Sequence, residues 1–155
     1  MKVGFLICGT QKGGTAASDA CLRRHPSICM ARRKEVHFFD DESPFENGSP
    51  DEVPYHEAFS PTDPAQLLGE STPAYMYWTD ALRRIWRYNP AMKLILLLRN
   101  PIERAYSHWN MARLENVDRL SLMTDREREF LRRTFEFEIR GLERLLAWDC
   151  RHWLS

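Results

Sequence analysis

The feature that most constrains the fold is a glycine-rich segment near the start of the chain, Gly9-Thr-Gln-Lys-Gly-Gly14. A continuous apolar run before it predicts a buried strand over residues 2–8, and a helix is predicted after it over residues 15–24. A strand, a loop and a helix N-terminus in this order form a phosphate cradle, because the loop N–H groups and the positive end of the helix dipole point at the same ligand. An ordinary glycine-rich turn has the same local pattern, so the loop by itself is weak support for a phosphate site.

The rest of the chain alternates predicted strands with predicted helices. Further strands are predicted over residues 27–31, 67–70 and 93–98, and helices over residues 55–59, 79–88, 101–115 and 118 to the end. Residues 41–64 are rich in proline and are predicted to be irregular. The alternation predicts an α/β fold, a P-loop-NTPase-like three-layer sandwich with a central, mostly parallel sheet flanked by helices. Its site is expected at the carboxyl ends of the strands.

Composition narrows the classes of function. The 155 residues predict a single domain, and 22 basic against 22 acidic residues give no reason to expect a nucleic-acid partner. No apolar run approaches the roughly 20 residues of a membrane span, and no signal-like segment precedes the first strand. The four cysteines and five histidines show no zinc-like spacing. We therefore expect a cytoplasmic protein without a metal site, and the oligomeric state stays open.

The glycine-rich segment can be compared with the nucleotide-binding P-loop, G-x-x-x-x-G-K-[ST]. Gly9 and Gly14 match its spacing, but Thr15 stands where an NTPase has its lysine, and Lys12 lies inside the loop. The strand over residues 93–98 is followed by Arg99, where an NTPase has an aspartate that holds magnesium. Because an arginine binds an anion directly, the sequence predicts a phosphate site without the metal-binding parts. A kinase-like nucleotide-binding protein is the less favoured alternative.

The loop and three other motifs together resemble those of sulfotransferases that use 3′-phosphoadenosine-5′-phosphosulfate (PAPS). The loop with Thr15 resembles the family's 5′-phosphosulfate loop. The stretch Leu98-Arg-Asn-Pro-Ile-Glu-Arg-Ala-Tyr-Ser-His-Trp109 resembles its 3′-phosphate motif. Lys34-Glu-Val-His-Phe-Phe-Asp40 and Glu70-Ser-Thr-Pro-Ala-Tyr75 are similar to motifs of the heparan-sulfate and related bacterial branch.

This resemblance implies a role for each matched position. Lys12 would contact the oxygen that bridges the phosphate and the sulfuryl group. The 5′-phosphate would be bound by the backbone N–H groups of Gly13, Gly14, Thr15 and Ala16. The Thr15 hydroxyl would donate a further hydrogen bond. Arg99 and Ser107 would hold the 3′-phosphate. Glu35 would be the general base that takes the acceptor's proton, with His37 beside it.

The residues themselves are consistent with metal-independent, in-line transfer of a sulfuryl group to a hydroxyl or amine of a carbohydrate or small molecule. Such a reaction depends on positioning and on stabilising charge, which Lys12 can do at the leaving phosphate. In strand-like geometry Glu35, His37 and Phe39 would share one face, placing a carboxylate beside an imidazole. A surface salt bridge with the cations before it is the alternative for Glu35. Tyr106 and Trp109 are expected in the core.

Two departures from the family pattern concern the acceptor and the length. Ser71 stands where relatives acting on heparan-type sugars often carry lysine. Domains that resemble this one normally continue further, so residues 1–155 are expected to form a single, C-terminally incomplete sulfotransferase domain. The alternative from another functional class is a non-catalytic module that binds PAPS or its product, 3′-phosphoadenosine-5′-phosphate (PAP).

Overall fold

The computed structural model describes residues 1–46, 48, 50–114 and 122–154. The chain divides into two compact units, Met1–Leu98 and Arg99–Ser155, and each is described by itself. In the described ranges no helix combines the length and apolar character needed to cross a bilayer.

The first unit is built on a four-stranded sheet in the order β2-β3-β1-β4, in which every pair is parallel. Its strands are β1 (Phe5–Gly9), β2 (Ile28–Met30), β3 (Leu67–Ser71) and β4 (Lys93–Leu96). The central strand β1 is buried along its whole length, as its apolar run predicts. Since β3 and β1 pair Ile7 with Ser71, their carboxyl ends lie together at one edge of the sheet.

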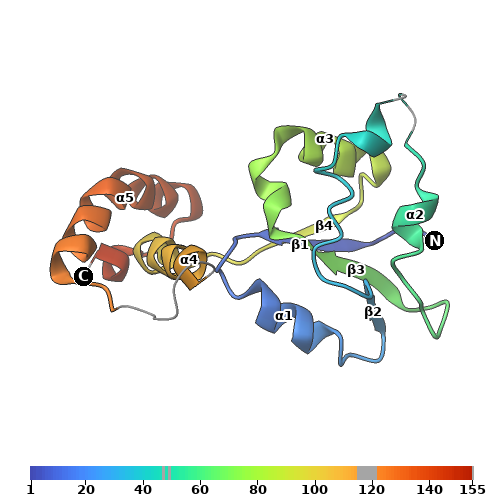
Figure 1. The fold of residues 1–155 in the computed structure, drawn as a ribbon, viewed down its shortest axis with the longest axis horizontal. Coiled ribbons are helices and arrows are strands. Elements are labelled where there is room, and N and C mark those ends of the chain that lie inside the picture. The colour runs from blue at the N-terminus through green and yellow to red at the C-terminus, as the bar shows by residue number, and fades with distance from the viewer. Residues whose placement is uncertain (47, 49, 115–121, 155) are drawn as a thin grey trace. The chain divides into compact units, whose positions relative to one another are not determined.

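Helices lie on both faces of this sheet, with α1 on one side and α3 on the other (Figure 1). The helical segments of this unit are α1 (Thr15–Leu22), α2 (Val53–His56), α3 (Thr79–Tyr88) and the 3₁₀ turns η1 (Ser43–Phe45) and η2 (Pro73–Tyr77). Helix α3 buries Ala81, Ile85 and Tyr88, which recur at the spacing of one helical face. The predicted α/β layering is confirmed.

Aromatic side chains form much of the core beneath the carboxyl edge of the sheet. Phe38 stacks on Tyr55 with ring centroids 4.5 Å apart, and Phe39 packs edge-on against Tyr55 and Tyr75. Phe39 and Tyr75 are fully buried. This packing ties the segment after β2 to α2 and η2.

The second unit contains α4 (Pro101–Leu114), α5 (Asp125–Leu146) and the 3₁₀ turn η3 (Arg151–Leu154). A capping box between Thr124 and Glu127 starts α5. The prediction of helix from residue 118 to the end is wrong at its C-terminal part, because Ala147 adopts a left-handed φ of 53° and ends α5. Residues 118–121 of that prediction lie outside the described residues.

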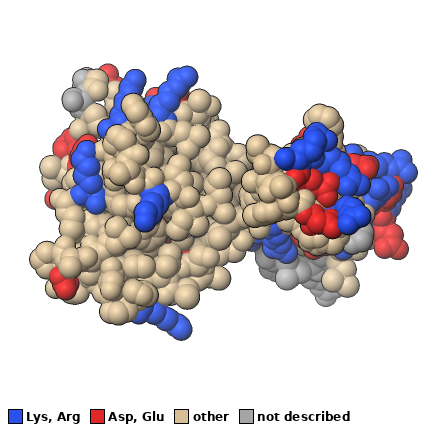
Figure 2. All heavy atoms as spheres, turned by 180° about the vertical axis from the view of Figure 1, so that it is seen from behind, with Lys and Arg blue, Asp and Glu red and all other residues tan. Residues whose placement is uncertain are grey.

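The surface of α5 is highly charged but mixed in sign, as Figure 2 shows. Glu129 pairs with both Arg132 (2.7 Å) and Arg133 (2.6 Å), and Arg140 pairs with Glu143 (2.8 Å). Such exposed pairs three or four residues apart contribute modestly to stability. The mixture is typical of a solvated helix face.

Candidate functional site

The glycine-rich loop leaves β1 and is held against the chain that continues β4. Both the N–H and the hydroxyl of Thr10 donate to the Leu97 carbonyl, at 3.1 and 3.0 Å, and the Leu97 N–H donates to Gly9 at 2.9 Å. A Cβ on Gly13 would lie 2.5 Å from the Leu97 carbonyl oxygen. This position therefore requires glycine because the loop passes so close to the backbone of its neighbour.

The loop runs directly into the N-terminus of α1. Gly14 is the N-cap and has a left-handed φ of 100°, and no side chain caps the helix there. The first intrahelical bond runs from the Ser18 N–H to the Gly14 carbonyl at 3.1 Å, so the N–H groups before it have no partner within the helix. Lys12, which also has a positive φ of 65°, is partly buried, Thr15 is buried and Ala16 is exposed.

One of the predicted phosphate-binding N–H groups is already engaged inside the loop. The Gly13 N–H donates to the Thr10 carbonyl at 2.9 Å and closes a tight turn. The described geometry thus gives Gly13 a steric role in shaping the loop. The helix N-terminus offers the N–H groups of Gly14, Thr15 and Ala16.

The segment that carries the predicted base is not a strand, so the expected strand-like geometry is wrong. Glu35 and His37 have left-handed φ values of 63° and 59°. Phe39 is fully buried whereas Glu35 and His37 are exposed, so these three side chains do not share a face. The carboxylate and the imidazole nevertheless lie close together, with Glu35 Oε2 and His37 Nε2 3.9 Å apart.

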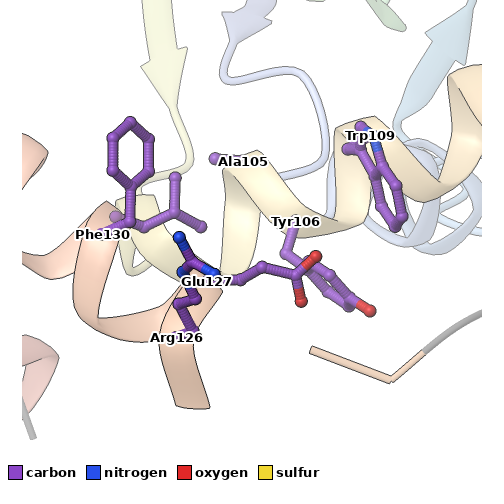
Figure 3. Close-up of a pocket in the computed structure, with 7 residues that line it drawn as sticks. Ala105, Tyr106, Trp109, Arg126, Glu127 and Phe130 are labelled. Carbon is purple, nitrogen blue, oxygen red and sulfur yellow. The ribbon is translucent and has the colours of Figure 1, made fainter. Parts of the chain in front are cut away.

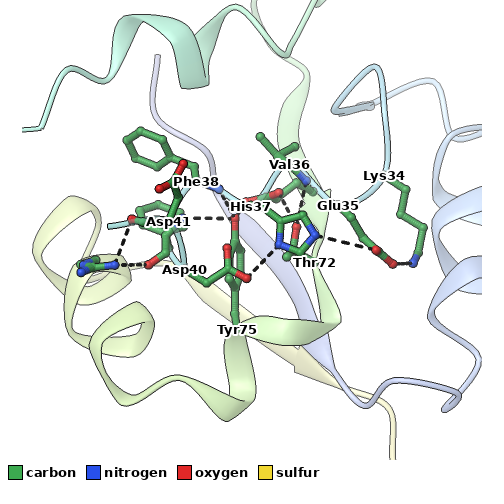
Figure 4. A network of polar contacts seen from close by, with 12 residues as sticks. Lys34, Glu35, Val36, His37, Phe38, Asp40, Asp41, Thr72 and Tyr75 are labelled. Carbon is green, nitrogen blue, oxygen red and sulfur yellow. Dashed lines mark hydrogen bonds and ion pairs between the residues drawn. The ribbon is translucent and has the colours of Figure 1, made fainter. Parts of the chain in front are cut away.

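Asp40 completes this cluster, and the sequence reasoning gave it no role. Its Oδ2 lies 2.8 Å from His37 Nδ1, and its side chain is only 7% exposed (Figure 4). A carboxylate can only accept, so His37 Nδ1 carries the proton and Nε2 faces Glu35. The His-x-x-Asp spacing was the signal available in the sequence. Lys34 Nζ also pairs with Glu35 Oε1, so the predicted salt bridge of Glu35 coexists with the cluster.

The base cluster and the glycine-rich loop lie at the same edge of the sheet. The Glu35 N–H donates to the carbonyl of Ser71, the last residue of β3, at 2.9 Å. The next N–H, that of Thr72, donates to Ile7 of β1 at 3.1 Å. The base segment follows β2 and the loop follows β1, and these two parallel strands flank β3 in the sheet. Both segments therefore lie at the carboxyl ends of parallel strands, which is where ligands bind in open α/β sheets.

A hollow of about 500 Å³ opens beside the base cluster in the same unit. Its lining combines cationic, apolar and carboxylate side chains, among them Arg32, Arg33, Val36, His37 and Asp41. Arg32 is held by a hydrogen bond to the Glu57 carbonyl. A polar acceptor molecule can thus approach the imidazole from this side.

The remaining two predicted residues belong to the second unit. Arg99 is exposed and lies just before α4, and Ser107 is partly buried on α4 itself. The Asn100 side chain starts α4 by accepting the Ile102 N–H at 2.9 Å. This unit contributes a cation and a hydroxyl from one short stretch of chain.

The second unit also has an apolar hollow of about 380 Å³ between α4 and α5 (Figure 3). Tyr106 and Trp109 line it from α4, and Phe130 lines it from α5. Trp109 is 43% exposed, so its predicted place in the core is wrong. Neither Arg99 nor Ser107 lines this hollow, and we do not assign it to the candidate site.

A family model described as the sulfotransferase domain matches residues 3–141. The chain belongs to the sulfotransferase family. The match extends over both units, and it confirms the family that the motifs resemble.

Similar proteins agree with this membership. Human heparan sulfate glucosamine 3-O-sulfotransferase 6 is 39% identical over 105 residues, which are 67% of this chain and 29% of that protein. The membrane-associated sulfotransferase kil1 of Dictyostelium discoideum is 33% identical over 108 residues, 70% of this chain and 22% of that protein. A solved sulfotransferase from Alicyclobacillus acidocaldarius matches with a TM-score of 0.64 and 26% identity, covering 89% of this chain and 60% of that one.

Most of the length of the two curated relatives has no counterpart in this sulfotransferase-family chain. It spans between about a fifth and a third of the length of the curated relatives quoted above. The activities in their names describe whole proteins. The family and the fold are therefore established, and the reaction of this chain is a proposal.

Proposed function

We propose that this sulfotransferase-family chain transfers the sulfuryl group of PAPS to a hydroxyl or amine of a carbohydrate or small-molecule acceptor. The observation that carries the proposal is the position of the Glu35–His37–Asp40 cluster at the same sheet edge as the glycine-rich loop. One segment offers groups that bind an anion, and the other offers groups that take a proton. Residues 1–155 would act as one domain, in keeping with a family match across both units.

The loop residues fit a phosphate group. Gly13 occupies a place where a Cβ would collide with backbone, and Gly14 leaves the start of α1 without a side-chain cap. The N–H groups of Gly14, Thr15 and Ala16 would bind the 5′-phosphate with the helix dipole behind them. Lys12 would neutralise charge that develops at the bridging oxygen.

The second unit would bind the other end of the cofactor. An arginine and a hydroxyl give a phosphate two kinds of donor, so Arg99 and Ser107 would hold the 3′-phosphate. When bound, PAPS supplies the sulfuryl group and a phosphate leaving group. The product that stays in the site is then PAP.

The base cluster would activate the acceptor. Glu35 is 47% exposed and can accept a proton from a hydroxyl or amine brought against it. His37 can share that proton through Nε2, because Asp40 fixes the imidazole orientation through Nδ1. Proton removal by a positioned base typically contributes about 10²–10⁴-fold to the rate.

A carbohydrate acceptor is favoured by the relatives whose names specify heparan sulfate glucosamine. The hollow beside His37 has a mixed lining in which Arg32 and Arg33 would provide hydrogen-bond donors for such a molecule. Ser71 replaces the lysine that relatives acting on heparan-type sugars often carry, and it is fully buried. The acceptor would therefore be recognised mainly by the hollow.

The test combines binding and turnover. PAP is titrated into the protein by calorimetry, and transfer from ³⁵S-labelled PAPS is measured across a panel of sugars, phenols and amines. Binding with transfer supports the enzyme, and binding without transfer by any acceptor supports the non-catalytic module instead. Magnesium-dependent ATP binding without PAP binding would support the kinase-like alternative. No binding of PAP at millimolar concentration would refute the proposal.

A further inference from the structure

The side chain of Glu70 lies fully buried at the carboxyl end of β3, surrounded by hydroxyl groups. Its Oε1 accepts hydrogen bonds from Tyr55 at 2.8 Å and from Tyr75 at 2.9 Å, and its Oε2 accepts one from Thr72 at 3.0 Å. A buried carboxylate requires such partners because it has left water. Tyr55 belongs to α2 and Tyr75 to η2, and Thr72 is the residue between β3 and η2.

Two of these hydroxyls also bind the segment that carries the base cluster (Figure 4). The Val36 N–H donates to Thr72 Oγ1 at 3.1 Å, and the Phe38 N–H donates to the Tyr75 hydroxyl at 3.1 Å. A backbone N–H can only donate, and each hydroxyl has a single proton. When Glu70 is ionised, each hydroxyl must therefore turn its lone pairs to the segment and its proton to the Glu70 carboxylate.

The segment needs this support because its backbone is strained. Glu35 and His37 both have positive φ, a backbone conformation that residues other than glycine rarely adopt. Such a conformation persists only where surrounding contacts hold it. Three backbone N–H groups of this segment are hydrogen-bonded: that of Glu35 to the Ser71 carbonyl, and those of Val36 and Phe38 to the two hydroxyls bound to Glu70. If the hydroxyls of Thr72 and Tyr75 were no longer oriented, two of these three hydrogen bonds would be lost.

We propose that Glu70 is a positioning residue for sulfuryl transfer: by orienting the hydroxyls of Thr72 and Tyr75, it holds Glu35 against His37 in the geometry that accepts the acceptor's proton. The inference rests on the proposed function, in which Glu35 is the base. Because Glu70 is fully buried, it would not touch the substrate or the cofactor. Its effect on the reaction passes through the backbone of residues 35–39.

The groups around Glu70 shift the pKa of its carboxyl. Burial raises its pKa to about 7, while the hydrogen bonds from Tyr55, Tyr75 and Thr72 oppose that rise. The other titratable groups facing it are Asp40, whose negative charge raises the pKa further, and Tyr88 of α3, whose own pKa the Glu70 charge raises. Substitution by glutamine keeps the shape of the side chain but replaces one acceptor atom by a donor, so at least one hydroxyl loses the acceptor for its proton.

The decisive experiment is a double-mutant cycle of Glu70→Gln with Glu35→Gln, with kcat and KM measured from ³⁵S transfer. If Glu70 acts through the base, Glu70→Gln lowers kcat by about 10- to 100-fold with KM for PAPS unchanged. It then has no further effect on the residual rate of Glu35→Gln. An equal loss in both backgrounds would show general damage and overturn the positioning role. Wild-type turnover in Glu35→Gln would instead overturn the proposed base, and with it the inference.

A second measurement does not depend on turnover. Amide hydrogen exchange is followed by NMR in wild type and Glu70→Gln. The Val36 and Phe38 amides are expected to exchange at least tenfold faster in the variant, while those of β1 are unchanged. Unchanged exchange at both amides would overturn the proposal even if kcat fell.

The chain also provides a matched control for the hydroxyls. Tyr75→Phe removes a hydroxyl bound to both Glu70 and the base segment, and it is expected to lower kcat as Glu70→Gln does. Tyr88→Phe removes a hydroxyl from another buried tyrosine of the same core, which accepts the Val3 N–H at 2.8 Å. The control is expected to leave kcat unchanged, and equal losses in both tyrosine variants would contradict the positioning role.

Discussion

The pH dependence of stability tests how deeply the Glu70 carboxyl is embedded in the fold. Burial, the largest cause, raises its pKa from 4.5 to about 7, even though three hydroxyls donate to it. In the unfolded chain the same carboxyl is exposed and has its ordinary pKa. The two states therefore bind the proton differently between pH 4.5 and about 7.

The sign and size of the effect follow from this difference. Between the two pKa values the folded state holds a proton that the unfolded state releases, so the free energy of unfolding falls as the pH rises. The fall is at most about 1.36 kcal/mol per pH unit and totals about 3 kcal/mol once the pH exceeds the folded-state pKa. Whole domains are stable by only about 5–15 kcal/mol, so the loss is measurable.

Urea unfolding followed by circular dichroism at pH values from 5 to 8 provides the assay. The wild type is expected to lose about 2.5 kcal/mol across this range, because pH 5 already lies above the unfolded-state pKa, and this loss lowers the urea midpoint by about 1–2.5 M. Glu70→Gln cannot titrate and should lack this component, whereas the exposed control Glu46→Gln should keep the wild-type decline. An equally steep decline in wild type and Glu70→Gln would refute the assignment of the raised pKa to this carboxyl.

Three further predictions address the rest of the site. Glu35→Gln should lower kcat by about 10²-fold or more with PAP affinity unchanged, and Asp40→Asn should lower it about tenfold by releasing the imidazole, both checked by ³⁵S transfer against PAP calorimetry. Arg99→Ala should weaken PAP binding but not binding of adenosine 5′-phosphate, which lacks the 3′-phosphate; equal losses for both ligands would contradict its role. Gly13→Ala should destabilise the fold by about 1–3 kcal/mol, since its Cβ would meet a carbonyl oxygen at 2.5 Å, whereas Gly141→Ala, where nothing lies within 4 Å, should stabilise α5 slightly in thermal melts.

The sequence predicted the first strand, the glycine-rich loop and the following helix well because their determinants are local. The apolar run of residues 5–8, the glycines and the following helix each have their own signal within a few residues. The parallel sheet followed from the alternation of strands and helices, and the structure confirms it. The engagement of the Gly13 N–H inside the loop could not be predicted, because it depends on the exact turn that the chain makes at Thr10.

The conformation of the base segment was harder to predict from the sequence, because residues far away in the chain determine it. The strand-like geometry considered for residues 35–39 is wrong because two of these residues have positive φ, which no sequence pattern of non-glycine residues indicates. The contacts that hold the segment come from Thr72 and Tyr75, more than 30 positions away. Tyr55, which completes the Glu70 network, lies in a region predicted to be mostly irregular.

The two halves of the candidate site should therefore fail in different ways. The glycine-rich loop is limited by space, so a side chain added at Gly13 is expected to damage it. The base segment is limited by hydrogen-bond direction, so an isosteric change at Glu70 damages it without altering any volume. A substitution that conserves size but not hydrogen-bond chemistry is then expected to separate cofactor binding from turnover. An enzyme needs the proton acceptor that the base segment would supply, and a module that merely binds PAP does not, so disruption of the Glu70 network is expected to lower turnover while PAP binding is kept.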